Sequence, residues 1–121
     1  MNDIIKSLYN RKSVRAYTGE AIPESDVNAI LEAAVQAPTA GNQQLYTILR
    51  ITDPEKKHAL SISCDNQPFI EKADLVLIFL ADCRKWYHAY QEAGADPRAP
   101  GEGDLLLAVC DAVIAAQKYM G

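Results

Sequence analysis

Three cations and a hydroxyl lie within five residues near the amino terminus. Arg11, Lys12, Ser13 and Arg15 belong to the segment RKSVRAY at positions 11–17. Guanidinium groups bind phosphate through paired hydrogen bonds, and an ammonium group adds a point charge. With one more bond from the serine hydroxyl, this segment suits the phosphate of a cofactor. The alternative is a solvated basic turn without a ligand, and the local residues alone favour that simpler interpretation.

A second candidate for chemistry is the segment APTAGNQQLY at positions 37–46. It has neither the helical nor the strand period, so it is predicted to be a loop. Its amide side chains offer donors and acceptors together, which suits the edge of a heterocycle. The alternative is an ordinary turn between a helix and a strand.

The hydrophobic pattern predicts the elements that must position these two segments. Helices are expected at 3–9, 23–36, 53–61 and 86–92, with a final helix capped by Asp104 and running to Met120. Strands are expected at 45–52 and 75–81, and the continuous apolar run of the second is typical of a strand covered on both faces. The order of elements predicts one α+β domain over 1–121, with helices around a small central sheet in three layers.

Composition narrows the class of protein. The chain has 121 residues and a net charge of −4, which disfavours a nucleic-acid module because such modules are usually basic. The longest apolar run, 75–81, is far too short to cross a bilayer, and no signal peptide is evident. His58 and His88 have no partner at metal-ligand spacing, so no metal site is expected. The three cysteines have no motif spacing, which predicts reduced, packed thiols in a cytoplasmic protein.

Taken in order, these segments resemble the flavin-dependent nitroreductase family. RKSVRAY is similar to the family's RxSxRxY-like segment, and 37–46 is similar to its APSxxNxQPW-like loop. The run DAVIAAQK at 111–118 is similar to a DAxxAAQN-like run in the family's long central helix. Thr39 replaces a common serine, and the family usually has proline and an aromatic residue where Gln44, Leu45 and Tyr46 stand. The chain covers only the amino-terminal half of the family pattern, so we expect an incomplete domain.

The resemblance implies an FMN-dependent oxidoreductase. Such a protein takes electrons from NADH or NADPH and passes them in ping-pong order to a small-molecule acceptor, which is a nitroaromatic, a quinone or a free flavin. The flavin carries the chemistry, and no side chain is required as an acid. By resemblance, Arg11 and Lys12 hold the phosphate, Ser13 holds the phosphate or the ribityl chain, and Arg15 lies beside the flavin N1 and C2 carbonyl.

The resemblance also implies a homodimer with shared sites. Pro38, Thr39, Asn42 and Gln44 are then expected to contact flavin from the partner subunit, and Gln67 is expected to read the pyrimidine edge of the ring. The final helix is expected to bury apolar surface against the second copy, through the stripe Leu105, Ala108, Val109, Ala112, Val113 and Ala116. The alternative function is a non-catalytic flavin-binding or dimerisation remnant that has lost the redox site.

Overall fold

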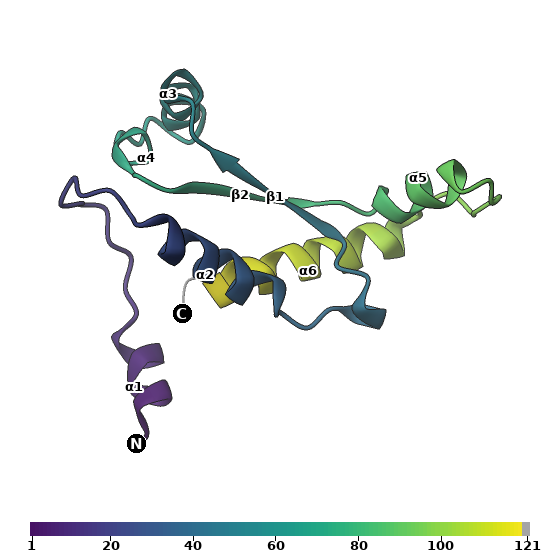
Figure 1. The fold of residues 1–121 in the computed structure, drawn as a ribbon, viewed down its shortest axis with the longest axis horizontal. Coiled ribbons are helices and arrows are strands. Elements are labelled where there is room, and N and C mark those ends of the chain that lie inside the picture. Colours follow the sequence, from purple (N-terminus) through teal and green to yellow (C-terminus); the bar gives the residue numbers. More distant parts are fainter. Residues whose placement is uncertain (120–121) are drawn as a thin grey trace. The chain divides into compact units, whose positions relative to one another are not determined.

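The computed structural model describes residues 1–119 (Figure 1). Its elements are α1 (Asp3–Asn10), α2 (Glu24–Val35), a 3₁₀ turn η1 (Ala40–Asn42), β1 (Tyr46–Ile51), α3 (Pro54–Ser63), α4 (Phe69–Lys72), β2 (Val76–Ala81), α5 (Lys85–Glu92) and α6 (Glu102–Tyr119). The two strands form one sheet. The predicted α+β class with a small sheet is therefore confirmed.

The chain divides into two compact units. The first contains residues 1–29 and 50–77, and the second contains residues 30–49 and those from 78 onward. The boundary runs through α2, β1 and β2, so each unit carries part of these elements. Our prediction of a single domain over 1–121 stays a prediction.

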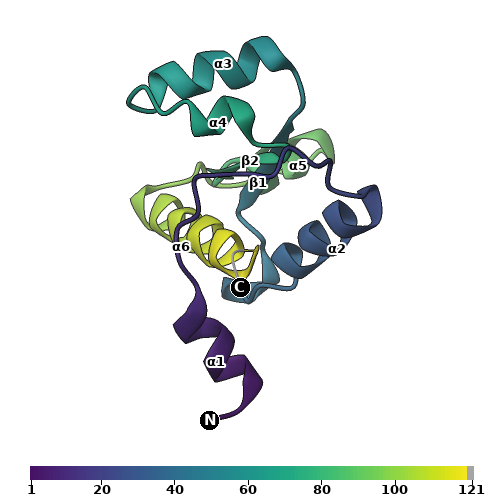
Figure 2. The same ribbon diagram turned by 90° about the vertical axis from the view of Figure 1, so that its left-hand side faces the viewer.

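The first unit contains α1, α3 and α4, with α3 and α4 side by side (Figure 2). Helix starts follow local chemistry: Asn2 caps α1 by accepting from the Ile5 N–H at 2.9 Å, and Asp53 caps α3 by accepting from the Glu55 N–H at 2.9 Å. Lys57 on α3 donates to the carbonyls of Ala73 and Asp74, both at 2.9 Å. These bonds fix the end of α4 against α3.

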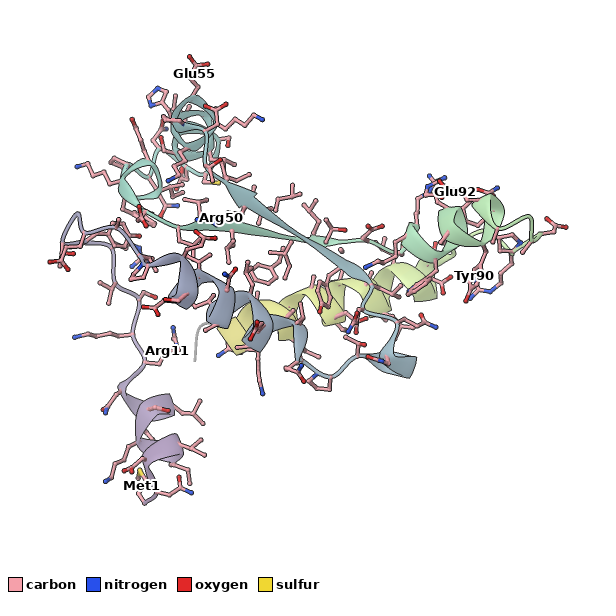
Figure 3. The ribbon with its side chains drawn as sticks, in the orientation of Figure 1. Met1, Arg11, Arg50, Glu55, Tyr90 and Glu92 are labelled. Carbon is pink, nitrogen blue, oxygen red and sulfur yellow. The ribbon has the colours of Figure 1, made fainter. Side chains whose placement is uncertain are left out.

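The same unit contains a bidentate ion pair between Arg50, near the end of β1, and Glu24, at the start of α2; Figure 3 labels Arg50. The two N···O distances are 2.6 and 3.0 Å. The hydrogen bond from Arg50 lowers the pKa of the Glu24 carboxyl. The Glu24 side chain is 64% exposed and the Arg50 side chain 38% exposed, so water screens the pair and its contribution to stability is small.

The second unit has a small core between the sheet and α6. Tyr46 on β1 is buried with Ala37, Ala112 and Ala115, and Phe79 on β2 packs against this cluster. The Asp82 N–H donates to the Leu45 carbonyl at 2.9 Å. Since this bond joins the start of β1 to the end of β2, the strands run antiparallel, as Figure 1 also shows.

Three details of the sequence prediction are wrong. β2 is not covered on both faces: its residues are half-buried or exposed, because the sheet has only two strands within residues 1–119. α6 starts at Glu102, before the expected cap Asp104, whose carboxylate instead accepts from the Gly101 N–H at 2.8 Å. Cys64 and Cys110 are exposed rather than packed, and Cys83 is half-buried.

The buried face of α6 also differs from the predicted stripe. Its buried residues are Ala108, Asp111, Ala112 and Ala115, at the i, i+3, i+4, i+7 positions of one face. The larger apolar residues point outward instead: Leu105, Leu106, Leu107, Val109, Val113 and Ile114. The predicted end of the helix at Met120 lies outside the described residues. No helix within residues 1–119 is long and apolar enough to span a membrane.

Candidate functional site

The cationic segment lies in the extended stretch between α1 and α2, where Figure 3 labels Arg11. Arg11, Lys12 and Ser13 are exposed. Within residues 1–119, none of their side chains forms a hydrogen bond or an ion pair. Two cations and a hydroxyl without partners fit a ligand that carries a phosphate, because their donors are not already used.

Arg15 differs from its neighbours in having an aromatic partner. Its guanidinium carbon lies 5.5 Å from the centroid of the Phe69 ring at the start of α4. A cation over a ring face is attracted by the ring quadrupole. The contact lies within the first unit, and Phe69 follows Gln67 by two residues in the chain. Two predicted flavin contacts, Arg15 and Gln67, are thereby brought to one region.

The turn before Gln67 has left-handed backbone at two successive residues. Asp65 and Asn66 have φ angles of 65° and 52°, in the left-handed region that aspartate and asparagine adopt more readily than other L-residues. The Gln67 side chain is fixed, since Nε2 donates to the Cys64 carbonyl at 2.8 Å and the backbone N–H donates to the Ser61 carbonyl at 2.8 Å. The amide oxygen of Gln67 therefore remains as an acceptor, which fits an N–H on a heterocycle edge.

The second loop, residues 38–44, also contains left-handed backbone. Asn42 and Gln44 both have φ angles of 52°, and Gly41 between Ala40 and Asn42 has a φ of 60°. Within residues 1–119, the left-handed residues other than glycine are the four in these two turns. Strained backbone persists where the surroundings enforce it, and it concentrates at ligand sites. The two turns are also the two segments that we expected to contact a flavin ring.

Two of the four predicted flavin contacts in the second loop are joined to each other by a hydrogen bond. The Thr39 hydroxyl accepts from the Gln44 N–H at 3.2 Å, and both residues are half-buried. Pro38 and Asn42 are exposed. The structure therefore groups Thr39 with Gln44 in the second unit, and Arg15 with Gln67 in the first.

Two side chains that the sequence analysis did not single out hold this loop. Lys85 on α5 donates to the carbonyls of Gln44 and Tyr46, at 3.0 and 3.1 Å. Asp111 on α6 is buried and accepts from the Leu45 N–H at 3.1 Å. Asp111 lies in the DAVIAAQK run, which was a usable signal, whereas no sequence pattern marked Lys85.

Burial raises the pKa of the Tyr46 phenol, and the nearby Asp111 carboxylate raises it further. The Tyr46 hydroxyl is buried without a hydrogen-bond partner within the described chain. Burial and the neighbouring charge both favour the neutral phenol, so Tyr46 is a packing residue of this core rather than an acid at physiological pH.

A third feature is the ion pair at the amino end of α6. Arg98 donates to the two carboxylate oxygens of Asp104, at 2.7 and 2.9 Å. The hydrogen bonds from Arg98, with that from the Gly101 N–H, lower the pKa of Asp104 to about 2. No cluster of three or more potential metal ligands occurs within residues 1–119.

Comparison with known proteins gives one consistent family. Residues 8–120 match the family model described as Nitroreductase family. A relative from Bacillus subtilis named FMN reductase (NADPH) is 30% identical over 119 residues, which are 97% of this chain and 48% of the relative. A relative from Vibrio harveyi named NADPH-flavin oxidoreductase is 28% identical, over 99% of this chain and 48% of the relative.

Solved structures of similar fold include further proteins named as oxidoreductases. NfrA2 of B. megaterium superposes with a TM-score of 0.91 at 32% identity, covering 99% of this chain and 49% of its own. The NADPH:FMN oxidoreductase from Vibrio harveyi complexed with NAD⁺ superposes with a TM-score of 0.87 at 28% identity, covering 98% of this chain and 50% of its own. The chain thus spans about half the length of the relatives it matches.

Proposed function

Because the chain belongs to the nitroreductase family, we propose that it provides the FMN-binding half-site of an NAD(P)H-dependent oxidoreductase. The observation that carries this proposal is the left-handed backbone in the two turns expected to contact flavin, at Asn42 and Gln44 and at Asp65 and Asn66. Relatives named for FMN and NADPH support the choice of cofactor and reductant.

The residues have separate tasks in this proposal. Arg11 and Lys12 bind the phosphate, and Ser13 donates to the phosphate or to the ribityl chain. Arg15 lies beside the N1 and C2 carbonyl end of the ring, where its charge stabilises the reduced anionic form. Gln67 accepts from the N–H of the pyrimidine edge through its remaining amide oxygen. When bound, the flavin supplies the electron transfer from NADH or NADPH to a nitroaromatic, quinone or flavin acceptor.

The second loop is assigned to the flavin of a second copy. Pro38, Thr39, Asn42 and Gln44 present a strained, polar surface that Lys85 and Asp111 hold in place. The exposed apolar face of α6 supports a homodimer, because Val113 is 62% and Leu106 is 66% exposed. Apolar surface of this kind is favourably covered by a partner.

Two half-reactions test the proposed activity. Under anaerobic conditions, NADH or NADPH should bleach the visible absorbance of the bound flavin, and a quinone added afterwards should restore it. If the protein binds flavin but neither nucleotide bleaches it, the non-catalytic alternative is correct and the proposed activity is wrong. That alternative is motivated by the half-length match to the relatives.

A further inference from the structure

The extended segment between α1 and α2 carries all the predicted phosphate contacts and Arg15. In Figure 1 it rises from α1 toward α4 and then turns into α2. Its residues 12–22 have no regular secondary structure. Backbone groups outside helices and sheets are satisfied by side chains or by water, so such a segment takes its position from contacts with other elements. The contacts that hold it therefore decide where its cations lie.

Two contacts join this segment to the stretch of the first unit that contains α4. Near the middle of the segment, the guanidinium of Arg15 lies 5.5 Å from the centroid of the Phe69 ring. At its end, the Ile22 N–H donates to the carboxylate of Asp74 at 2.8 Å. Asp74 lies between α4 and β2 and is 52 positions from Ile22 in the chain. Residues 15–22 are thus tied at both ends to residues 69–74, and all of these residues belong to the first unit.

Asp74 is itself held in place. Lys57 on α3 donates to the backbone carbonyl of Asp74 at 2.9 Å. The charge of Asp74 also acts on Arg50, whose pKa is raised chiefly by its hydrogen bonds to Glu24 and further by the charges of Glu24 and Asp74. Because Arg50 gives its two short hydrogen bonds to Glu24, the Asp74 carboxylate is left to accept from the Ile22 N–H.

We propose that Asp74 is a positioning residue for the flavin site: its carboxylate fixes the end of the extended segment, so that Arg15 lies beside the flavin ring. This inference rests on the proposed function, because it concerns the place of a predicted flavin contact. Without the bond, the Ile22 N–H turns to water and the segment samples more conformations. When the binding-competent conformation is less populated, the apparent affinity for the ligand falls in proportion.

Asp74 has two effects on a bound flavin, and they have opposite signs. Its negative charge disfavours the anionic reduced ring, so removal of the charge alone makes the midpoint potential more positive. Its hydrogen bond keeps a cation beside the ring, so loss of the bond makes the potential more negative. Asp74→Asn and Asp74→Ala both remove the charge, but only asparagine keeps a side-chain oxygen that can accept from the Ile22 N–H. The difference between the two variants therefore isolates the hydrogen bond.

The test compares FMN binding and the midpoint potential of bound FMN in the two variants. Asp74→Ala should bind FMN about threefold more weakly than Asp74→Asn, since the lost bond lies at the surface, and should have the more negative potential. A purely structural effect would lower the unfolding midpoint without separating the potentials of the two folded variants. Glu20→Ala and Glu20→Gln are the matched controls and should not differ from each other, because the Glu20 carboxylate, in the same segment, accepts no hydrogen bond within residues 1–119.

Amide hydrogen exchange, followed by NMR, tests the bond itself and requires neither a variant nor flavin. Ile22 and its neighbour Ala21 are both exposed residues of the extended segment. The Ile22 N–H donates to Asp74, whereas the Ala21 N–H has no acceptor in the part of the chain that the structure describes. The Ile22 amide should therefore exchange more slowly than the Ala21 amide, relative to the rates expected for an unstructured chain. Asp74→Ala should remove this difference, and Asp74→Asn should keep it.

An unprotected Ile22 amide in the natural protein would overturn the proposal, even if neither Asp74 variant folds. Equal FMN affinities and equal potentials in folded Asp74→Ala and Asp74→Asn would also overturn it, and would leave the proposed function intact if the natural protein binds FMN. A natural protein with a protected Ile22 amide that fails to bind FMN would contradict the proposed function, and the positioning role is then wrong as well.

Discussion

The guanidinium of Arg15 lies over the ring of Phe69, 5.5 Å from its centroid. This contact orders an otherwise exposed cation from the 11–15 segment without neutralising it, because an aromatic ring carries no net charge. A carboxylate partner in the same place would cancel the field that a reduced flavin needs. Phe69 is therefore expected to act as a positioning residue for Arg15.

Replacing Arg15 with alanine should weaken flavin retention and make the midpoint potential of the bound flavin more negative. The shift should be on the order of tens of millivolts, because the reduced ring loses its counter-ion. Phe69→Leu should shift the potential in the same direction by less, whereas Phe69→Tyr should not. Arg84→Ala is the matched control, since Arg84 also lies over a ring, that of Tyr87, outside the predicted flavin contacts. An unchanged potential in flavin-loaded Arg15→Ala would remove Arg15 from the ring.

Lys85→Met should destabilise the protein and loosen the 38–44 loop. The substitution keeps the length of the side chain but leaves the Gln44 and Tyr46 carbonyls without their donor. Hydrogen bonds from a charged group are worth about 1.5–3 kcal/mol, so the free energy of unfolding should fall by a similar amount in urea titrations. Lys56→Met on α3, where the lysine is exposed and has no partner within the described chain, is the control. Equal unfolding midpoints for the two variants would contradict the role of Lys85.

The Arg98–Asp104 pair predicts an acid-dependent contribution to stability. Its hydrogen bonds lower the pKa of Asp104 from 3.8 to about 2. A lowered folded-state pKa stabilises the fold above the unfolded value, and this stabilisation is lost as the pH falls through the folded value. The difference in melting temperature between the natural protein and Arg98→Gln should therefore be constant above pH 3.8 and disappear toward pH 2.

The magnitude of that difference should be small, because Arg98 is well exposed and water screens the pair. Asp96→Asn, which alters a carboxylate without a partner within residues 1–119, supplies the control. A difference between the natural protein and Arg98→Gln that grows as the pH falls would refute the assignment.

The outward face of α6 predicts self-association. Val113→Glu places a charge on an apolar face that is 62% exposed at this position, so it should favour the monomer without disturbing the inward alanines. Sedimentation at micromolar concentration should give a dimer for the natural protein and a monomer for the variant. Ile62→Glu, at a site 54% exposed on α3, should remain dimeric. A natural protein that sediments as a stable monomer would defeat the dimer proposal.

Most of the secondary structure could be predicted from the sequence because its signals are local. Asn2 and Asp53 cap their helices as short polar residues do, and the expected elements occur within a few residues of their predicted bounds. The face of α6 could not be predicted, because the pattern of apolar residues does not distinguish a face covered by alanines from one of larger side chains directed outward. The prediction that both faces of β2 are covered was wrong, because a continuous apolar run shows what a strand can bury but not which neighbours it has.

The candidate site also has a part that could be predicted from local sequence and a part that could not. Residue types and order mark Arg11 to Arg15 and the 38–44 loop as candidates, and their assignment as flavin contacts stays a prediction. The side chains that hold the loop could not be predicted. Lys85 donates to the carbonyl of Gln44, which lies 41 positions away in the chain. Phe69 contacts the guanidinium of Arg15, which is also distant in sequence. Such contacts depend on tertiary placement. Three of the four left-handed residues, Asn42, Asp65 and Asn66, are of the types that adopt this conformation most readily after glycine, whereas no residue type predicts it at Gln44.

The identity of the bound cofactor is the most direct test of the proposed function. The protein is purified without added flavin, denatured by heat, and the released cofactor is separated by chromatography and quantified against the chain. The arrangement of Arg11, Lys12 and Ser13 suits a single terminal phosphate, so the expected result is FMN at close to one equivalent per chain. Recovery of FAD in that amount, or a colourless protein that also fails to bind added FMN, would contradict the proposal.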